Sequence, residues 1–220
     1  MQALVSIQIG KPRAMESDPA FALSSKPWRT AIFKAPVSGK VNVGTEGIHG
    51  DGQADLKHHG GVDKAICVYP VEHFEYWRQQ LNRKDFGNGA FGENFSVAGL
   101  EESSVAIGDR WQIGTATFEV SQPRQPCWKL ARRWQSKTLA AQAIDSGKTG
   151  WYLRVIETGT IRCDAPIMVN CGSDTSQPRF TIADANDLFY GKQRDLKSLK
   201  QLLDVPQLSD AWRSELQAKF

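Results

Sequence analysis

The sequence is poor in several features that would mark a function. Its 220 residues include four cysteines, none in a CxxC pair, which argues against a structural zinc site or a thioredoxin-like pair. Lys and Arg number 27 against 24 Asp and Glu and form no basic run, so a nucleic-acid partner is not expected. Neither a signal peptide nor an apolar span of membrane length is present, so we expect a cytoplasmic protein with reduced thiols and no membrane contact.

Apolar residues at 40% and aromatic residues at 10% suffice for a packed core. Short β-rich segments alternate with glycine-rich loops, and a few helical segments lie between them. This pattern predicts a mainly β fold with inserted helices, in which the strands form a closed or nearly closed β-barrel. The predicted strands are residues 3–9, 30–34, 41–43, 64–69, 95–97, 105–111, 112–120, 151–156, 160–162 and 166–170, with 151–162 as a hairpin around Gly159.

A helix is predicted directly after the strand at 64–69. Pro70 is expected at its first position, and Phe74 and Trp77 belong to its apolar stripe. His73 lies off that stripe and is expected to face solvent. Residues 11–28 are predicted to form a loop.

The C-terminal part has a different character from the β-rich part. Residues 172–178 have the composition of a linker, and three short helical segments follow. Helices of this length are not stable alone in water, so they must pack on each other or on the β-rich part. We therefore predict a β-barrel domain at 1–172 and a three-helix subdomain at 177–220. Its helices are predicted at 182–190, 195–203 and 210–220.

The segment 121–130 has the strongest chemical signature. Pro123 and Pro126 fix the backbone and donate no N–H, which predicts a stiff loop rather than a central strand or a helix interior. Cys127 follows, at the predicted start of a helix and among cations. Such a thiol is favoured as a thiolate, which can attack an electrophile or bind a soft metal, whereas a buried inert cysteine is the alternative. The cations are Arg124, Lys129 and Arg132.

Three further segments are rich in glycine, histidine and acidic residues. No pair of histidines has HxH or HxxxH spacing, so the histidines are not expected to bind a metal directly. Together with residues 123–127, these segments resemble the MOSC domain, and most closely its YiiM-like branch. The resemblance covers residues 6–170, and the C-terminal part resembles the three-helix appendage of that branch. The three segments are residues 46–55, 57–64 and 91–95.

The resemblance implies a MOSC-type β-barrel that binds the molybdenum cofactor (Mo-molybdopterin). It implies that Cys127 is both the catalytic residue and the thiolate ligand of the metal. Cations would bind the phosphate of the cofactor, backbone N–H groups would add donors, and other polar groups would orient the ligands. His59 and Glu93 are weak candidates for a proton donor. The residues expected to bind the cofactor are Arg124, Lys64, His59, Asn94, Gly60 and Gly61.

The YiiM-like branch implies the detoxifying reduction of N-hydroxylated compounds, such as hydroxylaminopurine-type bases, to amines. The sequence has no flavin, iron–sulfur or NAD motif, so a separate flavin or iron–sulfur reductase is the expected electron donor. Nothing in the sequence requires or opposes a homodimer. Two alternatives stay open: a sulfur carrier that uses a Cys127 persulfide, and a non-catalytic module that binds the cofactor or docks through its helices.

Overall fold

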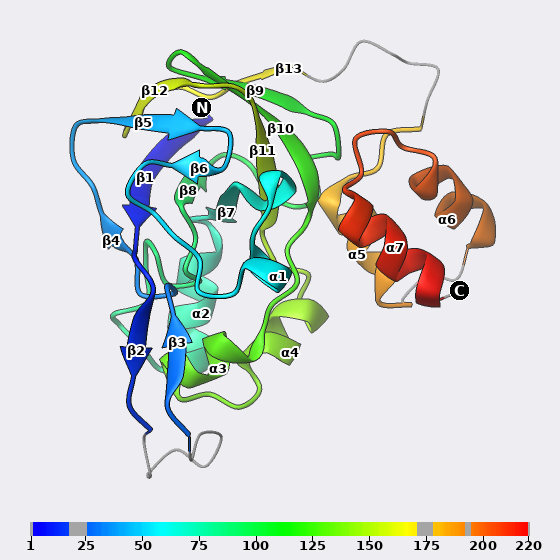
Figure 1. The fold of residues 1–220 in the computed structure, drawn as a ribbon. Coiled ribbons are helices and arrows are strands. Elements are labelled where there is room, and N and C mark those ends of the chain that lie inside the picture. Colours follow the sequence, from blue (N-terminus) through cyan, green and yellow to red (C-terminus); the bar gives the residue numbers. More distant parts are fainter. Residues whose placement is uncertain (1, 18–25, 171–177, 192–194, 220) are drawn as a thin grey trace.

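The computed structural model describes residues 2–17, 26–170, 178–191 and 195–219. Within this part of the chain, eight strands form one curled sheet, and two smaller sheets lie beside it (Figure 1). Neighbouring strands are antiparallel except for one central parallel pair, β7 and β8. In spatial order the strands of the large sheet are β13 (Met168–Asn170), β9 (Arg110–Ile113), β10 (Ala116–Pro123), β11 (Trp151–Glu157), β7 (Ile66–Pro70), β8 (Phe95–Ala98), β1 (Ala3–Ile9) and β4 (Ala35–Pro36).

The two ends of the large sheet approach each other because the chain before β13 lies against β1. The Leu4 N–H donates to the Ala165 carbonyl at 3.1 Å, and the Asp164 N–H donates to the Leu4 carbonyl at 2.7 Å. Ala3 also forms an isolated bridge with Pro166. The sheet is therefore rolled up almost to a closed barrel, and the predicted mainly β fold with inserted helices is confirmed.

The smaller sheets correct three predictions. β12 pairs with β5 and not with β11, so the predicted hairpin around Gly159 is wrong. The reason is that both edges of β11 are already occupied, by β10 and β7. Residues 11–28 are not all loop, and the strand predicted at 30–34 ends at Thr30. The strands of the smaller sheets are β5 (Lys40–Gly44), β6 (Gly47–Ile48) and β12 (Gly159–Arg162), then β2 (Arg13–Met15) and β3 (Trp28–Thr30).

The inserted helices cover one end of the barrel. Phe74 and Trp77 are buried as predicted, but Pro70 ends β7 rather than opening a helix. The prediction for His73 is also wrong, since its side chain is 3% exposed and lies 2.7 Å from the carboxylate of Glu102. The helix that begins at His73 is therefore buried on a second face, besides the apolar stripe that was predicted. The inserted helices are α1 (Leu56–His59), the 3₁₀ helix η1 (Val62–Lys64), α2 (His73–Leu81), α3 (Trp128–Trp134) and α4 (Leu139–Asp145).

Three C-terminal helices are present where they were predicted, within two residues at each end. Ser209 caps the last of them, because its hydroxyl accepts the Trp212 N–H at 3.2 Å. Trp212 and Leu216 belong to the same apolar cluster as Val120 of the barrel, so helices and barrel share one core. The predicted linker lies almost entirely outside the described residues. The helices are α5 (Ile182–Phe189), α6 (Leu196–Leu203) and α7 (Asp210–Lys219).

None of the helices in the described part of the chain combines the length and apolarity needed to cross a lipid bilayer.

The shared core predicts that the helices and the barrel unfold together. Leu216 is fully buried, and its replacement by alanine is expected to lower the free energy of unfolding by about 2–5 kcal/mol in one urea transition. Leu196→Ala is the matched control, because Leu196 is 65% exposed and should change stability by less than about 0.5 kcal/mol. Tryptophan fluorescence and circular dichroism report the transition. Two separated transitions in Leu216→Ala would contradict a shared core.

Candidate functional site

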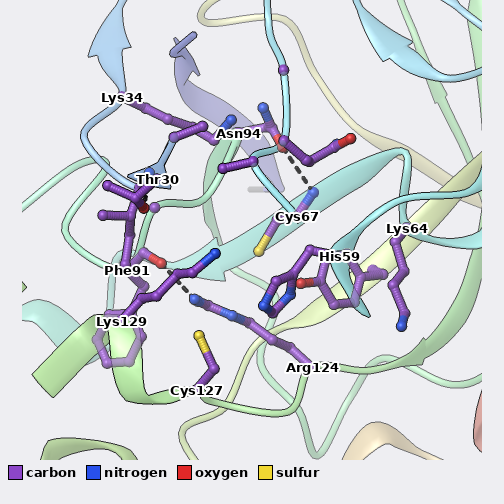
Figure 2. A pocket seen from close by; sticks show the side chains of 17 residues that line it. Thr30, Lys34, His59, Lys64, Cys67, Phe91, Asn94, Arg124, Cys127 and Lys129 are labelled. Atoms are coloured by element: carbon purple, nitrogen blue, oxygen red, sulfur yellow. Dashed lines mark hydrogen bonds between the residues drawn. The ribbon is translucent and has the colours of Figure 1, made fainter. Parts of the chain in front are cut away.

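A pocket lies at the end of the barrel, between α1 and η1 on one side and α3 on the other. The free space in the pocket, together with the open solvent at its mouth, amounts to about 570 Å³. Figure 2 shows that side chains from distant segments converge on it. Five residues predicted for the site line this pocket: Cys127, Arg124, Lys64, His59 and Asn94.

Cys127 is held at the junction of a strand and a helix. β10 continues to Pro123, three residues further than predicted, so the prediction that Pro123 belongs to a loop is wrong. Pro123 is tolerated because it pairs with Trp151 at the last position of the strand, beyond the end of the pairing with β9. The next residue, Arg124, donates its backbone N–H to the Gly150 carbonyl at 3.0 Å. Cys127 then has extended backbone angles and is the N-cap of α3. Its half-buried thiol therefore stands on the pocket wall on a short, well-anchored loop.

The Arg124 side chain is 6% exposed and only partly satisfied by the protein. Its Nη2 donates to the Phe91 carbonyl at 2.5 Å, and the guanidinium lies 5.5 Å from the centre of the Phe91 ring. Its buried Nη1 has no hydrogen-bond partner among the described residues. An unpaired buried donor costs about 1–3 kcal/mol, so this group is suited to an acceptor that a ligand brings.

His59 and Lys64 form the opposite wall. Burial, with the nearby charges of Arg124 and Lys129, lowers the pKa of His59 to about 4, so the imidazole is neutral at pH 7. Burial also lowers the pKa of Lys64, against the attraction of Glu215. The Lys64 ammonium donates to the His58 carbonyl at 2.8 Å. This wall therefore offers one cation and one neutral imidazole.

Asn94 lines the pocket, but its amide is fully used inside the protein. Its Oδ1 accepts the Cys67 N–H at 3.1 Å, and its Nδ2 donates to the Gln8 carbonyl and, at 2.8 Å, to Asp51. Asp51 in turn forms a buried ion pair with Lys34, which also lines the pocket. Asn94 therefore fixes the position of the Asp51–Lys34 pair.

Glu93, the other candidate for a proton donor, has its carboxylate engaged inside the protein. Its carboxylate is fully buried and accepts the Gly89 N–H at 2.5 Å, the Phe91 N–H at 2.9 Å and the Ser96 hydroxyl at 2.9 Å. These contacts hold together the glycine-rich loop before β8. This side chain is not among those that line the pocket.

The two glycines that were predicted to contact the ligand do not line the pocket. Gly60 and Gly61 are not among the lining residues, and the Gly60 N–H is used to end α1 at the Leu56 carbonyl. Gly52 and Gly92 line the pocket instead. Gly92 has a φ of 73°, and a Cβ there would lie 2.6 Å from the Ile32 side chain, so glycine is required at this position.

The lining residues that the sequence did not assign to the site include Lys34, Cys67 and Tyr152, and also Lys129, which was named only as a cation near Cys127. Cys67 lies in the strand predicted at 64–69 and is buried, but its side chain also reaches the pocket. Burial raises the pKa of Cys67 and of Tyr152, so both are neutral hydrogen-bond donors. Only Lys129, two residues after Cys127, carried a usable signal in the sequence.

No group of three or more His, Cys, Asp or Glu side chains in the described ranges could hold a metal ion. A metal in this pocket would therefore have few protein ligands, and its remaining ligands would arrive with a cofactor. Thiols are the soft ligands present, and Cys127 is the more exposed of the two that line the pocket.

Comparisons with known proteins agree with this architecture. Residues 55–168 match the family model of the MOSC domain, and residues 180–219 match that of the YiiM-like, 3-alpha helix domain. Protein YiiM of Escherichia coli is 37% identical over 193 residues, which are 86% of this chain and 84% of that protein. The crystal structure of YiiM from Geobacillus stearothermophilus has a TM-score of 0.81 at 36% identity and covers 100% of this chain and 99% of that one.

A more distant relative is named a reductase. This protein of Gibberella moniliformis is 28% identical over 186 residues, which are 80% of this chain but 31% of that protein.

The charges around His59 predict a measurable titration. We expect the imidazole resonances of His59 to show a midpoint near pH 4 in NMR spectra of the free protein. Lys129→Met should move the midpoint upward, because a cation that opposes the imidazolium is removed. Lys137→Met, at an exposed lysine just beyond α3, is the control and should leave it unchanged. A wild-type midpoint above pH 6 would contradict the burial and charge described for this wall.

Proposed function

The chain belongs to the MOSC domain family, in its YiiM-like branch, and on this premise we propose that it is a molybdenum-cofactor-dependent reductase of N-hydroxylated compounds. One observation carries the proposal. The half-buried thiol of Cys127 shares a pocket with the buried Arg124 guanidinium, whose Nη1 has no acceptor among the described residues.

The residues of the pocket fit such a cofactor. A thiolate is a soft ligand suited to molybdenum, and Cys127 would supply it. The Nη1 of Arg124 and the ammonium groups of Lys64 and Lys129 would bind the anionic oxygens of the phosphate by charge-assisted hydrogen bonds. The backbone at Gly52 and Gly92, rather than at Gly60 and Gly61 as predicted, would allow the cofactor to approach closely. His59 would contact the cofactor directly. Asn94 would contribute indirectly, because its amide holds Asp51 in place.

When bound, the cofactor supplies the two electrons that remove the oxygen of an N–OH group, and two protons complete the amine and a water molecule. The chain must therefore provide or relay protons near the substrate. Free His59 is a poor source, because its pKa is lowered to about 4. An anionic ligand beside Arg124 and Lys129 would offset those two charges and raise the pKa of His59. His59 would then be able to hold a proton at its ring nitrogen when the pocket is filled.

The relative named a reductase supports reductive chemistry for this chain. The chain matches 31% of that protein, so the source of electrons in that protein cannot be carried over to this chain. The electron donor is therefore part of the proposal. We infer a separate flavin or iron–sulfur protein as the donor, which would deliver electrons at the open mouth of the pocket.

One second function fits the same thiol. A persulfide on Cys127 would also be an anion beside Arg124 and Lys129, and it would make the protein a sulfur carrier. The two functions differ in what the purified protein contains, since a carrier has sulfur on the thiol without bound molybdenum. A module that binds the cofactor without turnover differs from both, because it holds molybdenum but reduces no substrate.

If Cys127 is the thiolate ligand of the metal, its replacement by serine should remove both the metal and the activity. In a host that makes the cofactor, wild-type protein should contain about one molybdenum per chain, and Cys127→Ser should lose most of it. Reduction of an N-hydroxylated base by Cys127→Ser should fall by more than about 100-fold, since the loss of groups that only orient a metal ligand already costs roughly 10- to 100-fold. Metal analysis and an amine assay with a chemical electron donor measure both.

Cys163→Ser is the control for this substitution. Cys163 is also a partly exposed thiol, but it does not line the pocket and lies near the Val37 carbonyl. This variant should keep metal and activity. Full activity of Cys127→Ser would refute the proposal, and cyanide-releasable sulfur on metal-free wild type would favour the sulfur carrier.

A further inference from the structure

The C-terminal helices contact the wall of the pocket through buried polar groups as well as through apolar packing. We refer to residues 121–127, which comprise the last three residues of β10 and the loop after it and carry Arg124 and Cys127, as the pocket loop. Two hydrogen bonds between buried side chains join α5 and the start of α7 to this loop and to the segment beside it.

The first contact is between Ser209 and Gln122. The Ser209 hydroxyl donates to the Gln122 Oε1 at 2.7 Å, and the Ser209 N–H donates to the Ser121 carbonyl at 3.1 Å. Ser209 and Gln122 are each 1% exposed. Ser209 is also the cap of α7, so the start of this helix is attached two residues before Arg124.

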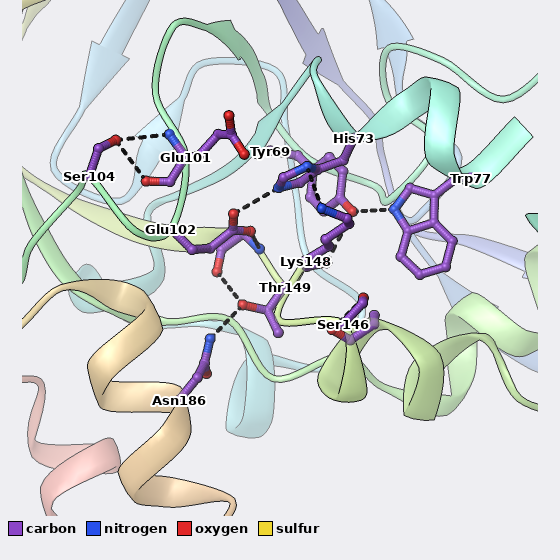
Figure 3. A network of polar contacts seen from close by, with 12 residues as sticks. Tyr69, His73, Trp77, Glu101, Glu102, Ser104, Ser146, Lys148, Thr149 and Asn186 are labelled. Carbon is purple, nitrogen blue, oxygen red and sulfur yellow. Dashed lines mark hydrogen bonds and ion pairs between the residues drawn. The ribbon is translucent and has the colours of Figure 1, made fainter. Parts of the chain in front are cut away.

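The second contact is between Asn186 of α5 and Thr149 (Figure 3). The Asn186 Nδ2 donates to the Thr149 hydroxyl at 2.9 Å, and that hydroxyl donates to the Gly150 carbonyl at 3.0 Å. The same carbonyl accepts the backbone N–H of Arg124. A chain of three hydrogen bonds therefore runs from α5 to the backbone of Arg124.

Glu102 holds the other side of Gly150. Its Oε1 accepts the Gly150 N–H at 2.8 Å, and its Oε2 lies 2.7 Å from the Nε2 of His73. Its backbone carbonyl accepts the N–H of Ala183, in the first turn of α5. The burial of His73, which the sequence did not predict, is explained by this contact.

Apolar packing alone does not require these groups. Burying a polar side chain is unfavourable unless it is hydrogen-bonded, whereas an aliphatic residue would pack without that cost. A buried hydrogen-bonded network favours one arrangement of the elements it joins, and here every contact named above is formed, although the Asn186 Oδ1 has no partner among the described residues. The network here joins α2, α5 and α7 to the two segments that carry Gly150 and Arg124.

We propose that the C-terminal helices are a positioning element of the pocket. Asn186 and Ser209 act through Thr149 and Gln122 to keep the pocket loop, and with it Arg124 and Cys127, facing Lys64 and His59. The inference concerns the same pocket and rests on the proposed function for one of its two readouts, the molybdenum content. It differs from the view that the helices serve to dock a partner.

The test uses two pairs of variants of the full chain. Thr149→Val keeps the shape of the side chain and removes the hydroxyl, whereas Thr149→Ser keeps the hydroxyl. Ser209→Ala removes the contact with Gln122, whereas Ser198→Ala removes a partly exposed hydroxyl in the first turn of α6 that donates to the carboxylate of Asp195, the cap of that helix. Hydrogen–deuterium exchange of peptides covering 121–127, and molybdenum per chain, are measured for all four.

Thr149→Val and Ser209→Ala should speed exchange in 121–127 by about 5-fold or more relative to the far side of the barrel, and should lower the molybdenum content. Thr149→Ser and Ser198→Ala should behave like wild type. The inference is overturned if the first two variants leave exchange in 121–127 unchanged, or if they speed it evenly across the barrel, as a purely stabilising contact would. If wild type itself holds no molybdenum, the proposed function fails, and the exchange pattern still decides this inference.

Discussion

The backbone hydrogen bond from Arg124 to Gly150 is the contact on which the pocket depends. It is formed just beyond the last pair of β10 and β11, Pro123 with Trp151, so it extends the register of two central strands into the loop that carries Cys127. The position of the thiol is therefore set by the sheet and not by the loop alone. The guanidinium of the same residue then reaches across to Phe91 and ties this loop to the segment before β8.

The charges of the barrel separate into paired and unpaired sets. Lys34 is neutralised by Asp51, and Arg154 by Asp63 and Glu119, all within hydrogen-bonding distance. Among the described residues, no such carboxylate pairs with Arg124 or Lys129. Removing a charge from water is costly unless a partner compensates it, so cations left unpaired in a pocket indicate a site for an anion. The ordinary ion pairs stabilise the walls, and the unpaired cations face the space between them.

Most strand positions along the chain could be predicted from the sequence, because alternation and glycine act locally, whereas the site residues were predicted from the resemblance to the MOSC domain. Cys127, Arg124, Lys64 and His59 were assigned to one site, and the structure places all four around one pocket. The errors concern partners that are distant in the chain. β12 was paired with β11, and His73 was placed in solvent, since neither the occupied edges of a strand nor the second covered face of a helix is visible in a local pattern. Lys34 was missed for the same reason.

The neutral side chains and the cations of the pocket affect one another through their charges. Cys67 and Tyr152 are held neutral by burial, and His59 is held neutral by burial and by cations. The pocket therefore keeps an excess of positive charge that its own acids do not cancel. An anion that enters removes the repulsion on the imidazole, and by linkage a protonated His59 must favour that anion to the same extent. Ligand binding and proton storage in this pocket are thus coupled through Arg124 and Lys129, and the network that fixes Arg124 governs both.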